Sequence, residues 1–157
     1  MEKLDPSFYD KQTTLVNFAS SLLAHYGVTP FHPSIPAVDE LLKNRQKVAV
    51  FLFDGAGEWV LKRWPHQDKY MREHGLLTIH SVNPATTVAC TTALLTGRYP
   101  IETGWLGWSL QFDSLGFPVD VFPNRNSLTG EALSGGNIME QTCPVEKLDV
   151  LIQKAGH

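Results

Sequence analysis

The sequence predicts an α/β fold built on a mostly parallel sheet, and three observations lead to that prediction. Residues 48–53 form a continuous apolar run, as expected of a strand buried on both faces. Residues 76–82 form a second strand-like segment, and residues 88–95 form a helix rich in small side chains. With a helix over residues 58–64 between them, the order strand, helix, strand, helix favours a right-handed parallel crossover.

The composition is that of one globular domain. The chain has 157 residues, of which 43% are hydrophobic and 18% charged. A net charge of -3 without a Lys/Arg cluster argues against a nucleic-acid polymer as partner, because tracking phosphates needs a basic face. No segment is long and apolar enough to suggest a membrane partner, and the start, Met1–Asp5, has no apolar run behind it. Cys90 and Cys143 lack metal-type spacing, so we expect a cytoplasmic protein.

The segment before the first strand, residues 1–46, is predicted to be a helical lead-in. Apolar residues at helical spacing predict a helix over 13–26, three prolines predict a loop over 28–36, and a short helix follows over 37–44. His32 lies in the loop without a partner at metal-ligand spacing, so we expect a surface or capping role.

Weaker patterns predict the elements outside this central part. Pro65 is expected to end the helix over 58–64. Apolar spacing and turn residues predict four further elements. They are a helical turn or two over 66–74, an irregular hairpin or insertion over 110–121, a loop over 123–142 and a final helix over 144–155.

Asp54 is the first candidate site residue. It follows the apolar run directly, at the edge where open α/β sheets bind ligands, and its carboxylate oxygens suit a divalent cation. Gly55 would let the backbone approach such a ligand closely. The alternative, equally supported by this feature alone, is that Asp54 caps the following helix.

Thr87 is the second candidate. It stands with Thr86 just before the 88–95 helix, so one of the two threonines is expected to cap that helix. The functional alternative uses the same position, because a hydroxyl at a helix N-terminus meets free backbone amides and the positive end of the dipole, where a phosphate binds.

The ordered combination of motifs resembles the alkaline phosphatase superfamily, specifically its branch of type I phosphodiesterases and nucleotide pyrophosphatases. The resemblance covers about residues 47–108 and rests on three segments, Phe51–Gly55, Asn83–Thr87 and Leu94–Gly104. It implies a three-layer α/β/α fold with a mostly parallel sheet. It also implies metal-dependent hydrolysis of a phosphate diester or monoester by a threonine nucleophile.

The resemblance assigns roles to four residues. Thr87 would be the nucleophile and a metal-bound oxygen, and Asp54 a metal ligand, with two divalent ions, zinc or manganese, as cofactors. Backbone amides from Val88 onward would hold the phosphoryl group of a small phosphate ester. Cys90 stands where nucleotide pyrophosphatases have an asparagine that holds a phosphoryl oxygen, and Thr103 stands where many relatives have histidine, so Thr103 is given no role.

The further metal ligands of this superfamily lie far downstream of the nucleophile. We therefore expect residues 47–157 to be the N-terminal half of a catalytic domain. Its site would be completed beyond this chain, and an open sheet edge would be available for association. The alternatives are a catalytically inert half-domain or interaction module, and a different phosphoryl or sulfuryl transfer enzyme on the same scaffold.

Other residues that could serve a metal or substrate site are weaker candidates. The histidines, His66, His74 and His80, are not spaced as a ligand set on one helix face. Trp105 and Trp108 are predicted to pack in the core, with the lining of a substrate pocket as the alternative.

Overall fold

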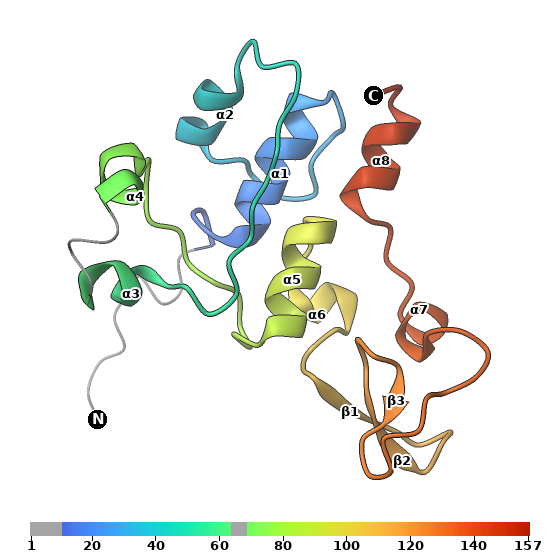
Figure 1. Cartoon of the computed structure of the whole chain (residues 1–157). Coiled ribbons are helices and arrows are strands. Elements are labelled where there is room, and N and C mark those ends of the chain that lie inside the picture. Colours follow the sequence, from blue (N-terminus) through green and yellow to red (C-terminus); the bar gives the residue numbers. More distant parts are fainter. Residues whose placement is uncertain (1–10, 64–68) are drawn as a thin grey trace.

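The computed structural model describes residues 11–63 and 69–157. In this part of the chain, helices surround a small core and a three-stranded sheet lies at one end (Figure 1). The helices are α1 (Leu15–His25), α2 (Pro36–Leu42), α3 (Glu58–Arg63), α4 (Lys69–His74), α5 (Thr87–Thr96), α6 (Pro100–Thr103), α7 (Ile138–Thr142) and α8 (Leu148–Lys154). The strands are β1 (Ser109–Phe112), β2 (Phe117–Asp120) and β3 (Arg125–Asn126).

The main core lies where α1, α2, α5 and α8 meet. The apolar positions of α1 recur at helical spacing, and Ala19 and Leu23 are fully buried. Val38 from α2, Leu94 from α5 and Leu148 from α8 complete the cluster. Fully burying a side chain of this size contributes about 1.5–3 kcal/mol, so this cluster holds the N-terminal helices to the rest of the chain.

A second packing unit joins the sheet to α5 and α7. Strands β1 and β2 form an antiparallel hairpin in which Ser109 pairs with Asp120 and Phe112 with Phe117. A buried cluster of Val88, Val121 and Met139 connects this end of the molecule to α5.

The prediction of a mostly parallel, three-layer α/β/α sheet is wrong. The sheet of the described residues is antiparallel, has the order β1-β2-β3 and comes entirely from the chain after residue 108. Residues 48–53 form no ladder, and Phe51 and Phe53 are 80% and 63% exposed. A strand buried on both faces needs a neighbouring strand and covering helices. None of the described strands pairs with this segment.

The second predicted strand, residues 76–82, also joins no sheet. Its only bridge among the described residues pairs His80 with Thr14 in parallel, through hydrogen bonds from His80 N to Thr13 O (2.7 Å) and from Leu15 N to His80 O (3.1 Å). The backbone groups of this segment are therefore used to hold the start of α1, and they do not build the predicted crossover.

The local predictions fare better. The structure confirms the predicted helices over 13–26, 37–44, 58–64 and 88–95, as α1, α2, α3 and α5, and the hairpin over 110–121. The final helix is confirmed but begins only at Leu148, and the predicted loop over 123–142 contains α7, which Asn137 caps by accepting from Met139 N and Glu140 N. The predicted stop at Pro65, the first residues of the 66–74 turn and the chain start at Met1–Asp5 lie outside the described residues.

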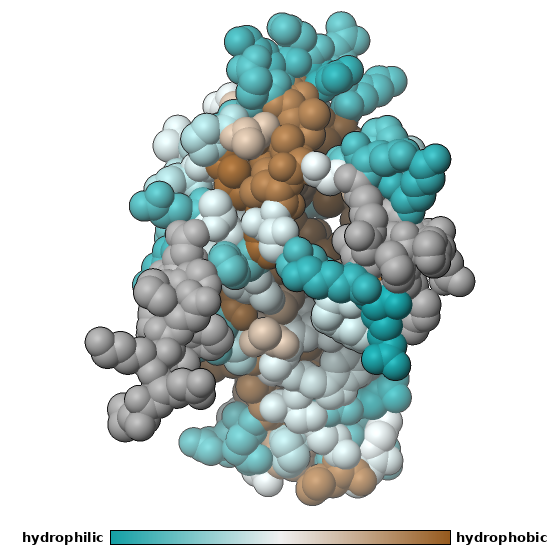
Figure 2. Space-filling view, turned by 90° about the vertical axis from the view of Figure 1, so that its left-hand side faces the viewer, coloured by the Kyte–Doolittle hydropathy of each residue, from teal (hydrophilic) through white to brown (hydrophobic). Residues whose placement is uncertain are grey.

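Hydrophobic side chains remain on the surface of this fold. Figure 2 shows a hydrophobic strip between hydrophilic patches on the side that carries α3 and α4. The exposed large side chains include Val50, Leu52, Leu76 and Leu77 from the two extended segments. Within the described ranges, no helix has both the length and the apolar character needed to cross a membrane.

Candidate functional site

The N-terminus of α5 positions the two threonines differently. Thr86 is the N-cap, with extended backbone angles, and its side chain accepts a hydrogen bond from Ala89 N at 3.3 Å. Thr86 also donates to the carbonyl of Leu106 at 3.3 Å. Thr87 is the first helical residue and is exposed. The capping role therefore belongs to Thr86, which leaves the hydroxyl of Thr87 available.

The structure brings Asp54 and Thr87 together. The Thr87 hydroxyl donates to Asp54 Oδ2 at 3.2 Å and lies 3.5 Å from Oδ1, although 33 residues separate the two positions. Asp54 begins a tight turn in which Gly55 has a φ of 70°. Because α3 starts only at Glu58, Asp54 is not the residue that caps it. Asp54 thus faces Thr87 even though the strand predicted before it does not form.

Val88 contributes a backbone amide beside Thr87. Ala89 N is bonded to the Thr86 side chain and Cys90 N donates to Thr86 O at 2.9 Å, whereas Val88 N has no acceptor in the described part of the chain. The Val88 side chain is fully buried. A free amide at the N-terminus of a ten-residue helix is a natural donor to an anionic oxygen.

Cys90 lies one turn after Thr87 on the same helix. It is half-buried, and its Sγ is 2.9 Å from the hydroxyl of Ser81. The thiol is thus engaged with the segment that leads into α5. The sequence does not mark Ser81 as a candidate. The one sequence signal for it is that Ser81 alternates with the buried Val82 along an extended segment, which places the Ser81 side chain on the opposite, accessible face.

The oxygens of Asp54 and Thr87 fit part of the coordination shell of one divalent cation. Both are hard donors, and two ligands at about 2 Å from one ion lie at a separation like the one observed. The described residues contain no group of three or more His, Cys, Asp or Glu side chains that could hold a metal. Any ion here would therefore need ligands from elsewhere to complete its shell.

Two of the histidines have other partners, and the third is not described. His74 stacks on Tyr70 with ring centroids 4.2 Å apart, and His80 is held through its backbone to the start of α1. His66 lies outside the described residues. His32, for which a surface or capping role was expected, lies with its Nε2 2.8 Å from Glu102 Oε2.

Thr103, at the end of α6, and the two tryptophans that follow it have mainly structural contacts. Trp105 is half-buried against the Val88 cluster and donates from Nε1 to Cys143 O at 3.4 Å, while Trp108 is half exposed. Thr103 is buried, donates to Pro100 O and accepts from Trp105 N, both at 3.3 Å. Trp105 also lines a cavity, and the lining of a substrate pocket stays a prediction.

Comparison with known proteins gives no relative: no family model, no curated protein and no solved structure matches this chain.

Proposed function

We propose that this chain carries the nucleophile part of a metal-dependent hydrolase of phosphate diesters or monoesters. The observation that carries the proposal is the contact between the Thr87 hydroxyl and the Asp54 carboxylate, beside a free amide at the start of α5. The order of motifs from residue 47 to 108, which resembles the type I phosphodiesterase branch, supports it. Two free cysteines support a reducing compartment, hence the cytoplasm.

The residues at the start of α5 would act together. Asp54 would orient the Thr87 hydroxyl and take its proton as the oxygen attacks phosphorus and the P–O bond to the leaving alcohol breaks. The alcohol would carry that proton away, and water would then hydrolyse the phospho-threonine and restore the hydroxyl. Val88 N donates to a phosphoryl oxygen, and the helix dipole stabilises its negative charge. The Cys90 backbone is already bonded within the helix, so any role of Cys90 in substrate binding falls to its thiol, through the contact with Ser81.

A divalent cation, zinc or manganese, would be held by the Asp54 carboxylate and the Thr87 oxygen. When bound there it would lower the pKa of the hydroxyl, which an unassisted threonine needs in order to attack. The missing ligands of this ion, and all ligands of a second ion, would have to come from residues beyond those described.

The second candidate is an interaction module without catalysis. It is favoured by the exposure of both Asp54 and Thr87, because a working site normally excludes water, and by the exposed apolar side chains of residues 50–53.

The test measures hydrolysis of p-nitrophenyl phosphate and bis(p-nitrophenyl) phosphate with zinc, with manganese and with a chelator. Any metal-dependent turnover should fall by about a thousandfold or more in Thr87→Ala, as for loss of other catalytic nucleophiles. Thr91→Ala, one turn further along the same helix, should keep the wild-type rate.

The outcomes separate the two candidates. Turnover that survives in Thr87→Ala would remove Thr87 as the nucleophile. A folded chain that is inert and also binds neither zinc nor manganese tightly would favour the interaction module, whereas an inert chain that binds zinc with a defined stoichiometry would fit one part of a site completed elsewhere.

A further inference from the structure

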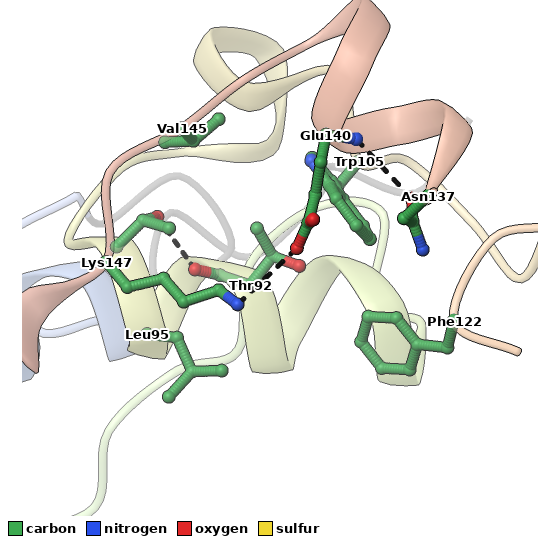
Figure 3. A pocket seen from close by; sticks show the side chains of 9 residues that line it. Thr92, Leu95, Trp105, Phe122, Asn137, Glu140, Val145 and Lys147 are labelled. Atoms are coloured by element: carbon green, nitrogen blue, oxygen red, sulfur yellow. Dashed lines mark hydrogen bonds and ion pairs between the residues drawn. The ribbon is translucent and has the colours of Figure 1, made fainter. Parts of the chain in front are cut away.

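A cavity of about 220 Å³ lies between α5, α7 and the segment after β2. Figure 3 shows its walls: Thr92 and Leu95 from α5, Trp105 and Phe122 from the chain around the sheet, and Glu140 and Lys147 across the opening. It shares no lining residue with the Asp54–Thr87 site. Apolar cavities of about 150 Å³ hold benzene, so this one has room for a ring system of about nine or ten non-hydrogen atoms.

The aromatic side chains that line the cavity favour an aromatic ligand. Trp105 and Phe122 have ring centroids 5.9 Å apart at an interplanar angle of 51°, and Trp108 contacts the same Phe122 ring in a T-shaped arrangement at 6.2 Å. Tilted and edge-to-face pairs leave ring faces and edges available, so a further ring can join the cluster with favourable geometry.

Most polar groups in the wall already have partners. The Asn137 amide donates to Val121 O at 2.8 Å, the Thr96 hydroxyl donates to Thr92 O at 2.7 Å, and the Trp105 indole donates to Cys143 O. Since these groups serve the fold, they add little demand for a polar or charged ligand.

Thr92 is the exception. Its residue is only 8% exposed, its hydroxyl forms no hydrogen bond with the rest of the described chain, and Figure 3 shows the side chain directed toward the space between Trp105 and Lys147. The hydroxyl is not a fully buried, unpaired group, and it borders the open cavity, so it is available to a molecule that enters. A ligand with one N–H or O–H group would be a partner for it.

The opening is bordered by a weak ion pair. Lys147 Nζ lies 3.7 Å from Glu140 Oε1, and both side chains are more than half exposed. Exposed pairs of this kind hold their partners loosely, so the two side chains can separate to admit a small molecule.

We infer that this cavity is a binding site for a small, uncharged aromatic molecule bearing one hydrogen-bonding group, of the size of indole or phenol. The ring would pack against Trp105 and Phe122, and its N–H or O–H would bond the Thr92 hydroxyl. The site is independent of the proposed phosphate chemistry.

The test uses 5-fluoroindole and fluorobenzene as probes. Each probe is titrated with the whole chain, and its fluorine NMR signal is monitored. We expect a saturable shift for 5-fluoroindole, accompanied by a shift of the Trp105 indole N–H signal in nitrogen-edited spectra. Leu95→Phe should fill the cavity and weaken binding at least tenfold, whereas Leu128→Phe, on a side chain 75% exposed and outside the cavity, should leave binding unchanged.

Thr92→Val tests the hydrogen bond. We expect it to weaken 5-fluoroindole several-fold while leaving fluorobenzene unaffected, because fluorobenzene has no group to pair with the hydroxyl. Amide spectra that match the wild type would show that both variants are folded. The absence of a saturable shift with the wild-type chain would overturn the inference, and so would equal binding by Leu95→Phe and Leu128→Phe.

Discussion

Thr86 and Thr87 are adjacent threonines with separate tasks at the start of one helix. Thr86 accepts from Ala89 N and donates to Leu106 O, so it serves the fold. Thr87 directs its hydroxyl to Asp54 and is exposed. The two tasks can be separated by matched substitutions, since the change from threonine to alanine is the same at both positions.

We expect Thr86→Ala to lower the free energy of unfolding by about 1 kcal/mol, the usual cost of losing an N-cap. Thr87→Ala should change it by less than about 0.5 kcal/mol, because it removes an exposed group outside the cap. Urea denaturation followed by circular dichroism measures both values. A cost for Thr87→Ala as large as that for Thr86→Ala would mean that Thr87 is a structural residue.

Among the elements, the extended segment over residues 48–53 differs most from the structure that its sequence pattern predicts. Its apolar side chains are the strongest strand signal in the chain, yet Phe51 and Phe53 face solvent. On its other side, Val48 and Leu52 border an apolar groove that also contains Leu94. The segment is therefore held by one row of side chains and not by a ladder of backbone hydrogen bonds.

This difference predicts the effect of a single substitution. Phe51→Ala should cost less than about 0.5 kcal/mol, whereas a phenylalanine buried in a central strand would cost about 3–5 kcal/mol. Leu23→Ala, in the fully buried part of α1, serves as the reference and should cost about 2–5 kcal/mol. Thermal unfolding of the three proteins makes the comparison, and a large loss for Phe51→Ala would contradict the exposed arrangement.

Across the whole molecule, an ion pair connects the N-terminal loop to α6. His32 Nε2 lies 2.8 Å from Glu102 Oε2, over a separation of 70 residues. Glu102 also accepts from Tyr99 N at 2.6 Å, and the Arg98 guanidinium lies 3.6 Å above the ring of Phe31. These contacts hold the loop before α2 against the start of α6.

The pKa of Glu102 predicts a dependence of stability on pH. Partial burial acts to raise this pKa, but hydrogen bonds from Tyr99 N and His32, with the charges of His32 and Arg98, together lower it below 4.5. A carboxyl group whose pKa is lower in the folded state adds stability at pH values above its pKa in the unfolded chain. That stability is lost as the pH falls through the pKa of the folded state.

We therefore expect the difference in unfolding free energy between the wild type and Glu102→Gln to be larger at about pH 6 than at about pH 3. Denaturation at a series of pH values measures it, and the double variant with His32→Gln shows how much of the effect belongs to the pair. A difference that stays constant with pH would rule out this contribution.

Much of the local structure could be predicted from the sequence. The spacing of apolar residues is enough to place α1, α2 and α5, because a helix forms its hydrogen bonds within the segment itself. Asp54 and Thr87 could be selected as candidates for the same reason, since each follows a local signal, a turn or a helix start. The short helix α7 was missed because its signal, the cap at Asn137, stands in a region rich in turn residues.

Tertiary structure alone decided which extended segments pair. A strand is stabilised by a partner elsewhere in the chain, so residues 48–53 and 76–82 carry a strand pattern without forming a ladder with each other. For the same reason, the approach of Thr87 to Asp54, the pair of His32 with Glu102 and the cavity beside Thr92 arise only when distant segments pack together. The sequence by itself determined most of the helices and the candidate residues, because local hydrogen bonds and side-chain spacing encode them. Packing determined which of those residues meet.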